Sequence, residues 1–328
     1  MIGTGYNEVN RSDEVLRSQV GGTTVTTQTD YTYSQDHLQL TRQATTDSEG
    51  RTRATEYEYA EDFTENGFGS NLLRRDHMHS QVLLQIDYTQ VGGSEEEVQR
   101  LATTYSEASG HVLPSFATYH PKGVAALESI TTSYSYDAAG NLTRQQREDE
   151  NAIAYRYGYN NRYPVVQAEN AEVNEIFYTS FEETDQNVST TQARTGQQSH
   201  VGTYTVTLPP AGGSYLLTYW LKESETTGEW TFFSQTITAN TDIGIPTNLI
   251  DEVRVHPLDA LMTTYTYDPL RGMTSQTDPS GRTTYYEYDE LSRVKLIRDT
   301  EREIVSRYQY HYANQKYRLH YPYFFITK

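Results

Sequence analysis

Polar and apolar residues alternate with a period of two in short stretches that carry tyrosine on one side. In Thr132-Ser-Tyr-Ser-Tyr136 the two tyrosines share a face, because alternate residues of a strand point the same way. Asp137-Ala-Ala-Gly140 then suits a tight turn, since Asp bonds its own downstream backbone and Gly140 tolerates positive φ. Alternation resumes at Asn141-Leu-Thr-Arg144, so this stretch predicts a β-hairpin.

The Tyr-x-Tyr element recurs, with a period of 21 or 22 residues where copies are adjacent. A lone hairpin is marginal in water, so the repeats are expected to stack on one another. The copies are Tyr31/Tyr33, Tyr57/Tyr59, Tyr134/Tyr136, Tyr155/Tyr157, Tyr265/Tyr267, Tyr286/Tyr288 and Tyr308/Tyr310.

Composition supports an all-β chain whose packing uses amphipathic tyrosine rings. Hydrophobic residues make up 35% of the 328 residues, and 29 residues are Tyr. The aromatic content of 12% argues against disorder, because disordered segments are poor in aromatic residues. Thr, Tyr, Val and Ser are abundant, as is typical of strands.

Charge and cysteine content narrow the classes of partner. A net charge of −18 predicts repulsion from nucleic acid and from anionic membrane surfaces. The absence of cysteine excludes disulfide frameworks and thiolate metal sites. No apolar run reaches the roughly 20 residues of a membrane-spanning helix. Met1 to Asn10 carries no signal-peptide pattern, so an export signal is expected upstream of this fragment.

Residues 177–257 lack the Tyr-Asp pattern and contain both tryptophans, Trp220 and Trp230. Short apolar runs separated by turn residues predict a small β-sandwich. In Tyr215–Leu221 both faces are apolar, which indicates a central strand and favours a core position for Trp220. The expected strands are 200–208, 215–221, 229–238 and 249–256.

The repeats resemble the YD repeat of RHS proteins, teneurins and the shell subunits of insecticidal toxin complexes. The resemblance rests on Thr132 to Arg144, on Thr264-Tyr-Thr-Tyr-Asp268 and on Tyr286-Glu-Tyr-Asp289. It is degenerate at the N-terminal end, and Ser292 replaces the family's turn glycine. The resemblance implies stacked hairpins that spiral into a hollow shell.

We therefore expect three segments: a YD-repeat sheet over residues 1–176, an inserted jelly-roll sandwich over 177–258, and a second YD-repeat sheet over 259–328. In this interpretation the repeat tyrosines pack hairpin on hairpin, while the aspartates and glycines form the turns. These structural positions are Tyr134, Tyr136, Asp137, Gly140, Tyr265, Tyr267, Asp268, Gly281, Tyr286, Tyr288 and Asp289.

The inserted segment resembles galactose-binding-like jelly rolls, which include many carbohydrate-binding modules. The resemblance lies in Tyr178-Thr-Ser-Phe-Glu182, in the strand that ends at Leu221, and in Ile250-Asp-Glu-Val-Arg-Val255. It implies a structural calcium ion held by Glu182 and Asp251, since carboxylates suit a hard cation. The alternative is that both are ordinary polar residues at strand ends.

Exposed aromatic rings in the insert are candidates for stacking on a sugar. We single out Trp230, Tyr219 and Phe232 as the candidate glycan-binding residues, with Trp230 the ring most expected to be exposed near a loop. The alternative is that these rings fill the core of the sandwich.

Other candidate chemistry is sparse. Asp278-Pro-Ser-Gly281 resembles an element of the self-cleaving core of some RHS proteins, but it also makes a good turn inside a repeat. His77 and His79 would share a face in a strand, yet two histidines without a third ligand favour a solvated edge over a metal site. Nucleotide-binding and nucleophile-elbow motifs are absent from the sequence.

The sequence thus predicts a structural shell fragment of a secreted or cell-surface protein, which encloses or displays a downstream effector, and no enzyme activity. Two alternatives stay open: a glycan-binding adhesin acting through the insert, and an autoproteolytic toxin core. No nucleic-acid partner and no membrane insertion are expected.

Overall fold

A computed structural model describes residues 11–20, 23–91, 93–122, 129–183, 186–206, 213–238, 243–245 and 249–310. The prediction of an all-β chain is confirmed, because antiparallel strands dominate the described residues. Sixteen strands form one continuous sheet. The expected features of the first ten residues, of Pro209 to Gly212 and of the segment after Tyr310 lie outside the described residues.

Consecutive strands pair as antiparallel neighbours through the first eleven strands of the large sheet. The order along the sheet is the order along the chain, as stacked hairpins require. These strands are β1 (Arg11–Val20), β2 (Thr23–Tyr33), β3 (Leu40–Thr46), β4 (Thr52–Glu58), β5 (Leu84–Val91), β6 (Ser94–Ala108), β7 (His111–Pro121), β8 (Ile130–Tyr136), β9 (Leu142–Arg147), β10 (Ile153–Gly158) and β11 (Tyr163–Glu169).

The large sheet then continues past the insert without a break. β11 pairs directly with β20, with Val166 opposite Thr264 and Ala168 opposite Met262. The last five strands are β20 (Leu261–Asp268), β21 (Gly272–Thr277), β22 (Thr283–Tyr288), β23 (Val294–Arg298) and β24 (Ile304–Arg307). About ninety residues therefore leave and re-enter the sheet between two neighbouring strands.

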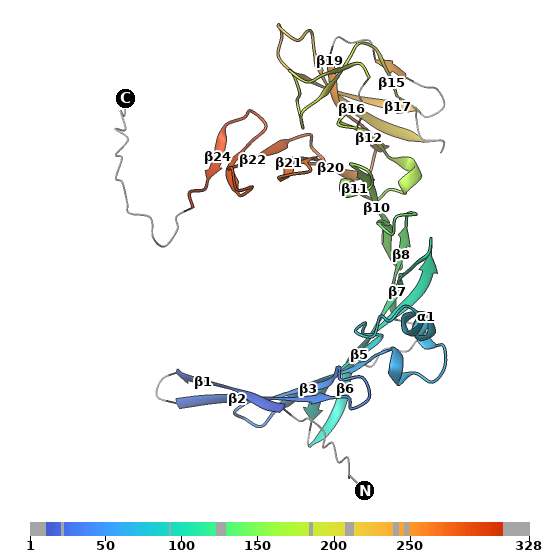
Figure 1. Cartoon of the computed structure of the whole chain (residues 1–328), viewed down its shortest axis with the longest axis vertical. Coiled ribbons are helices and arrows are strands. Elements are labelled where there is room, and N and C mark those ends of the chain that lie inside the picture. The colour runs from blue at the N-terminus through green and yellow to red at the C-terminus, as the bar shows by residue number, and fades with distance from the viewer. Residues whose placement is uncertain are drawn as a thin grey trace.

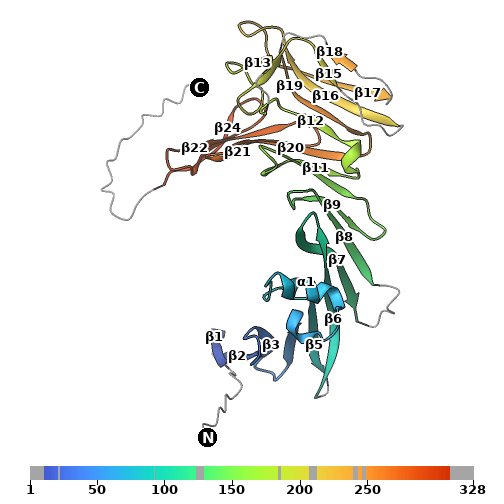
Figure 2. The ribbon, with the colours of Figure 1, turned by 45° about the vertical axis from the view of Figure 1, so that its right-hand side comes forward.

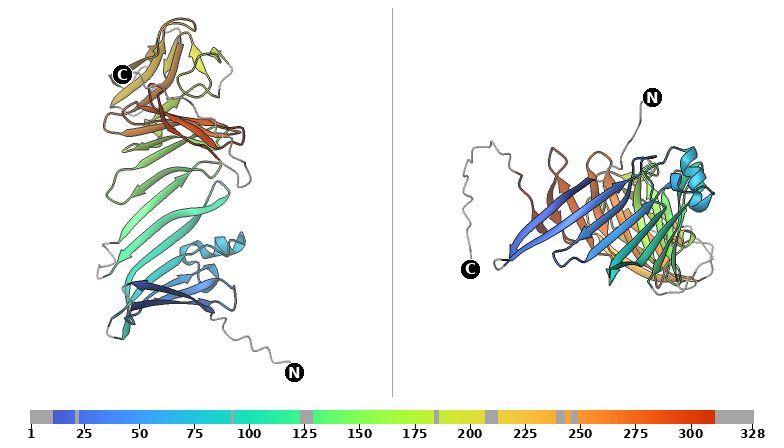
Figure 3. Two further views of the ribbon diagram at one scale, coloured as in Figure 1. Left: turned by 90° about the vertical axis from the view of Figure 1, so that its left-hand side faces the viewer. Right: turned by 90° about the horizontal axis from the view of Figure 1, so that it is seen from below.

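The sheet curves into an arc whose edges are β1 and β24, as Figure 1 shows. The insert and helix α1 (Ser70–Arg75) lie on the outer side of this arc. Figure 2 shows the insert lying along β11 and β20–β22, and Figure 3 shows the strands stacked as rungs.

Residues 59–83 form a short helical excursion that the expected run of strands did not include. It contains η1 (Ala60–Asp62), η2 (Gly67–Gly69) and α1. Leu73 and Leu83 of this excursion are buried against Tyr105 and Val112 of the sheet. The excursion folds because these apolar residues cover one face of the strands below.

Residues 109–121 continue the regular hairpin pattern although they contain Pro114 and Pro121. Residues 111–121 form strand β7, and the hairpin from β6 turns tightly at Ser109 and Gly110. Pro114 is tolerated inside β7 because the pairing register shifts beside it, where a ladder N–H is not required.

The insert forms two small sheets around one apolar core. β19 and β16 are central in the larger sheet, and Phe181, Leu217, Ile250, Val253 and Val255 are among its buried residues. Its strands are β12 (Phe177–Thr179), β13 (Val188–Ser189), β14 (Ser199–Val201), β15 (Tyr204–Val206), β16 (Ser214–Lys222), β17 (Thr231–Thr238), β18 (Ile243–Ile245) and β19 (Leu249–Pro257). The jelly-roll assignment itself stays a prediction.

Among the described residues, none of the helices has both the length and the apolar character needed to cross a membrane.

Candidate functional site

The repeat turns share one hydrogen-bonding pattern built on a leading aspartate. In Asp278-Pro-Ser-Gly-Arg282 the carboxylate accepts the backbone N–H groups of Ser280 and Arg282, each at 2.9 Å, and the Arg282 side chain. Asp289 is bonded in the same way by Leu291 and Arg293. Asp137, Asp47 and Asp299 close equivalent turns. The aspartate therefore satisfies backbone groups that the turn would otherwise leave open.

The fourth residue of each turn has a positive φ. Gly140 and Gly281 adopt φ of 84° and 80°, which glycine tolerates without strain. Ser292 adopts φ of 58° in the same position, so the turn forms despite the missing glycine. Asp278 to Gly281 is thus one of the ordinary repeat turns, and autoproteolysis there remains an untested prediction.

A β-bulge accompanies the second tyrosine of each clear repeat, and the sequence pattern did not reveal it. Opposite Tyr267 the register skips Thr274, and opposite Tyr136 it skips Thr143. The hydroxyl of Thr143 donates to the carbonyl of Ser135 at 3.1 Å. The bulge residue thereby satisfies a carbonyl that the interrupted ladder leaves without its usual partner.

The second tyrosine of a repeat bonds the bulge of the hairpin before it. The hydroxyls of Tyr267 and Tyr288 donate to the carbonyls of Pro164 and Met273, at 2.8 and 2.7 Å. Tyr59 and Tyr310 do the same to Leu40 and Val294. In each case the acceptor is the residue just before the bulge residue of the neighbouring hairpin. We call this hydrogen bond the tyrosine stitch.

The first tyrosine of five repeats faces a glutamine on the partner strand. Tyr265 alternates with Thr264 and Thr266, which are buried toward the insert, so these tyrosines and glutamines lie on the other face of the sheet. The rings are half-buried and form an uncharged polar layer. The pairs are Tyr31/Gln43, Tyr57/Gln85, Tyr134/Gln145, Tyr155/Gln167 and Tyr265/Gln276.

The insert is docked on the large sheet through a small apolar layer. Ala154, Val166, Ala168 and Met262 of the sheet are buried together with Ile176, at the start of the insert. Small side chains on the sheet allow the insert to approach closely. This packing explains why the outward face of β10, β11 and β20 is not exposed to solvent.

Buried polar groups continue the docking surface. Glu252 accepts hydrogen bonds from Tyr178 and Thr195 of the insert, both at 2.9 Å, and from Thr264 of the sheet. Arg254 donates to the carbonyl of Asp278 at 3.0 Å and is almost fully buried. Burial lowers the pKa of Arg254, while the carboxylate of Glu252 nearby opposes that shift. These bonds fix the orientation of the insert on the sheet.

The three candidate glycan-binding residues do not form one platform. Tyr219 packs against the insert core and stacks on Phe233, whereas Phe232 lies on the other side against Trp220, with ring centroids 5.2 Å apart. A Cβ built at Gly281 would lie 2.9 Å from the Phe232 ring, so Phe232 contacts a repeat turn of the sheet. Trp230 is half-buried and immediately precedes β17. Glycan binding stays a prediction.

Glu182 and Asp251, the candidate calcium ligands, hold a loop of the insert through backbone N–H groups. Glu182 accepts Gln197 and Gln198 at 2.8 Å each, and Asp251 accepts Arg194 and Thr195 at 2.8 and 2.9 Å. The described residues contain no group of three or more His, Cys, Asp or Glu placed to hold a metal ion. A calcium ion at Glu182 and Asp251 remains an expectation without a test.

Burial raises the pKa of both carboxyl groups. The pKa of Glu182 rises to about 7, because desolvation outweighs the two backbone N–H bonds. Asp251 is fully buried, and desolvation together with the neighbouring Glu252 raises its pKa well above the ordinary value. Gly196 allows this arrangement, since a Cβ there would lie 2.4 Å from the Glu182 Oε1 atom.

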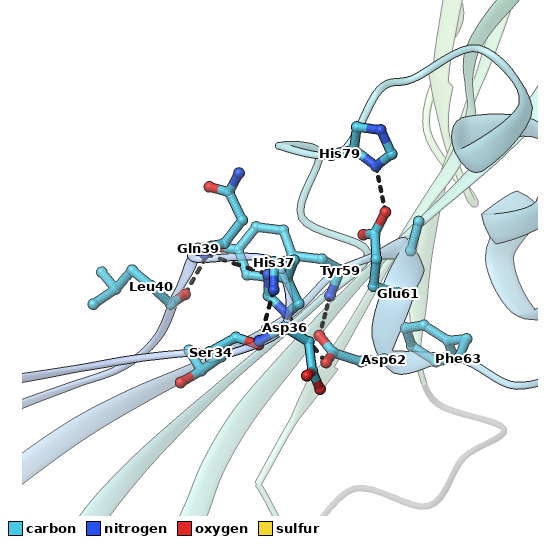
Figure 4. Close-up of polar contacts among 12 residues, drawn as sticks. Ser34, Asp36, His37, Gln39, Leu40, Tyr59, Glu61, Asp62, Phe63 and His79 are labelled. Atoms are coloured by element: carbon cyan, nitrogen blue, oxygen red, sulfur yellow. Dashed lines mark hydrogen bonds and ion pairs between the residues drawn. The ribbon is translucent and has the colours of Figure 1, made fainter. Parts of the chain in front are cut away.

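His77 and His79 follow α1 and do not lie in a strand, so the shared strand face considered for them does not exist. His77 has φ of 56°. His79 bonds Glu61 within the helical excursion, whereas His37 bonds Asp62 at 3.3 Å and so ties the excursion to the β2–β3 turn (Figure 4). The His37 Nδ1 atom also accepts the Gln39 N–H, so its two ring nitrogens contact Gln39 and Asp62. This cluster is a structural anchor.

Comparison with known proteins adds little. No protein-family model matches the chain, and no curated protein matches it. The chain is similar to solved structures of toxin complexes: a Tc holotoxin pore of Photorhabdus luminescens carrying a TccC3 mutation (11% identity, 92% of this chain, TM-score 0.24) and TcdB2–TccC3 (11% identity, 88% of this chain, TM-score 0.26). A third is TcdB2–TccC3 without its hypervariable C-terminal region (10% identity, 89%, TM-score 0.23). The chain spans 15%, 18% and 19% of those chains, and TM-scores this low carry no argument about function.

Proposed function

We propose that this chain is a wall segment of a toxin-complex-like β-shell, secreted or displayed at a cell surface, and that it has no catalytic activity. The observation that carries the proposal is the continuous pairing of β11 with β20, which carries the sheet past the insert. A shell wall requires that each hairpin is bonded to the next. The tyrosine stitch between Tyr267 and Pro164 supports such bonding where β11 meets β20.

In this proposal the insert braces the wall from outside, and the uncharged Tyr/Gln layer forms its inner surface. A downstream effector would be enclosed or displayed by the complete shell. The buried bonds of Glu252 and Arg254 to the sheet support bracing, because a freely displayed module would not bury charged groups against its support.

Hydrogen exchange of the full chain tests the wall role. If β10, β11, β20 and β21 form one cooperative wall, their amides will exchange with the same opening free energy in rising denaturant. Loss of protection in β20–β24 while β8–β11 stay protected would overturn the proposal, because the insert would then separate two independent units.

The competing proposal, a glycan-binding adhesin, is favoured by one observation: the Trp230 and Phe232 side chains are not fully buried. A glycan array with the full chain, with and without calcium, tests it. Saturable binding that a Trp230→Ala variant loses would move the function to the insert; an empty array from a folded chain would leave the wall proposal in place.

A further inference from the structure

Four side chains form an alternating stack where the insert meets the large sheet. The Arg194 guanidinium lies 3.9 Å from the Trp220 ring centroid and 5.7 Å from that of Tyr285. The Arg302 guanidinium lies 3.5 Å from the Tyr285 ring centroid. Trp220 and Arg194 belong to the insert, whereas Tyr285 and Arg302 belong to β22 and the β23–β24 turn. The stack therefore spans the docking surface.

Three polar atoms in this stack are buried and have no hydrogen-bond partner. They are the Arg194 Nε, the Trp220 Nε1 and the Tyr285 hydroxyl, and they are three of the five such side-chain atoms found in the described residues. The side chains are 8%, 9% and 4% exposed. Burial raises the pKa of Tyr285, and the nearby Thr283 hydroxyl, which pairs with that of Thr277 at 3.1 Å, opposes that shift. An unmet buried donor costs free energy, so a cluster of them points to an acceptor.

The local charge indicates what kind of acceptor fits. Neither Arg194 nor Arg302 forms an ion pair with any described residue; each donates to a backbone carbonyl, of Thr300 and of Arg194 respectively. Burial lowers the pKa of Arg194 and the nearby carboxylates of Asp251 and Glu252 oppose that shift, but their oxygens are hydrogen-bonded to other groups. Asp251 accepts the backbone N–H groups of Arg194, Thr195 and Glu252, and Glu252 accepts three hydroxyls.

We propose that this stack is a binding site for a small oxyanion, of the phosphate, sulfate or carboxylate class. The Arg194 Nε, the Trp220 Nε1 and the Tyr285 hydroxyl supply the donors, and Arg194 and Arg302 supply the positive charge. Charge-assisted hydrogen bonds to such a ligand satisfy the buried donors and balance the two guanidinium groups. Arg302 is exposed and stands at the solvent side of the stack, so a ligand enters past it.

The site has a consequence for the docking of the insert. Because its donors come from both the insert and the sheet, a bound oxyanion stabilises the docked arrangement over the undocked one. The wall proposal does not require this site, and the site does not require the wall proposal. Failure of either leaves the other intact.

Tryptophan fluorescence of the full chain provides the test. The chain has two tryptophans, so a Trp230→Phe background leaves Trp220 as the reporter. Inorganic phosphate is titrated against sodium chloride at matched ionic strength. We expect a saturable change in Trp220 emission and a parallel rise in the melting midpoint. Acetate and sulfate titrations then show whether carboxylates bind as well.

Two variants in the same background make the test specific. Tyr285→Phe keeps the ring and removes the hydroxyl, and we expect it to weaken phosphate binding by about tenfold or more, the effect of one hydrogen bond to a charged group. Tyr265→Phe, on the other face of the sheet, is the matched control and should bind phosphate unchanged.

The proposal is overturned if sodium chloride reproduces the phosphate effect, or if Tyr285→Phe and Tyr265→Phe bind phosphate equally. A high-resolution structure grown in phosphate that places only a water molecule on the three donors would also overturn it. If Tyr285→Phe does not fold, Arg302→Gln at the exposed end of the stack replaces it, with the same expected loss of binding.

Discussion

The Tyr267 hydroxyl donates to the carbonyl of Pro164 at 2.8 Å, although the two residues are 103 positions apart in the chain. Pro164 lies in the last strand before the insert, and Tyr267 lies in the first strand after it. The tyrosine ring also stacks on Tyr163, with centroids 4.9 Å apart. One side chain thus joins the two halves of the sheet with the same contact that joins ordinary neighbouring hairpins.

Removal of this hydroxyl should weaken the junction without disturbing the ring. For Tyr267→Phe we expect a loss of about 1 kcal/mol in the free energy of unfolding, because one hydrogen bond is lost and a half-buried carbonyl loses its donor. Urea denaturation measures this. The control is Tyr265→Phe, whose hydroxyl makes no hydrogen bond to a described residue, and equal effects of the two variants would contradict a role for the stitch.

Substitutions at the fourth residue of two repeat turns should change the free energy of unfolding in opposite directions. Ser292→Gly should stabilise the chain by about 1 kcal/mol, since a non-glycine residue with positive φ is strained. Gly281→Ala should destabilise it by more than that, because the new Cβ would also lie 2.9 Å from the Phe232 ring.

Gly50→Ala separates strain from contact in this comparison. Gly50 has φ of 76° in an equivalent turn, and a Cβ there meets nothing within 4 Å. The difference between Gly281→Ala and Gly50→Ala, read from melting midpoints, therefore reports the contact between the insert and the turn. If the two substitutions cost the same, Phe232 does not press on that turn.

Local chemistry made part of this fold predictable from sequence. The spacing of Tyr134, Tyr136, Asp137 and Gly140 indicates a strand followed by a turn. Both structures depend on interactions between residues that are close in the sequence. The prediction of an all-β chain followed from such units and is confirmed.

The bulges and stitches could not be predicted in this way. The residue that a bulge skips, such as Thr274, is set by pairing with another strand, and the alternation of either strand alone is unchanged. The stitch from Tyr267 to Pro164 depends on which hairpin lies next in space. A signal did exist in the recurring Thr or Ser that bonds back across the bulge, as at Thr41, Ser115 and Thr143.

The docking of the insert on the sheet could not be predicted from the sequence either. Glu252 meets Thr264, and Arg254 meets Asp278, only after the sheet has closed behind the insert. A buried glutamate with φ of 54° in the middle of a strand has no pattern that sequence alternation reveals. The helical excursion was missed for a related reason, because its apolar residues find their partners on β6 and β7.

The turn aspartates predict a loss of stability in acid. Hydrogen bonds from Arg293 lower the pKa of Asp289 below its ordinary value of 3.8. A lowered folded-state pKa contributes stability above the unfolded-state pKa, and that stability is lost as the pH falls through the folded-state value. Asp289→Asn keeps an acceptor for the backbone but loses the ion pair with Arg293.

The melting midpoints of the wild type and of Asp289→Asn should therefore differ near neutral pH and converge as the pH falls through the lowered folded-state pKa of Asp289. The matched control is Asp268→Asn, because the Asp268 carboxylate lies 3.7 Å from Arg271, a longer contact than the 2.7 Å between Asp289 and Arg293. If the difference in melting midpoint between the wild type and Asp289→Asn stays constant from neutral to acid pH, the charge of the Asp289 carboxylate contributes nothing to stability.

Glu182 predicts the reverse dependence. Its folded-state pKa is about 7, above the ordinary value of 4.5, because burial disfavours the carboxylate. The stability that this raised pKa contributes is fully present below pH 4.5 and is lost as the pH rises toward 7. The slope is at most about 1.4 kcal/mol per pH unit, and solvent at this half-buried site reduces it. Glu182→Gln should flatten this part of the profile, whereas Glu183→Gln, at an exposed neighbour, should not.

The same profile tests the calcium expectation. A calcium ion bound by Glu182 and Asp251 would favour their ionised forms, so saturating calcium should remove the loss of stability between pH 4.5 and 7 in the wild type. Glu182→Gln should then show no response to calcium. If calcium leaves the wild-type profile unchanged, the two carboxylates serve to hold the backbone of residues 194–198, as the bonds from Thr195 and Gln198 already indicate.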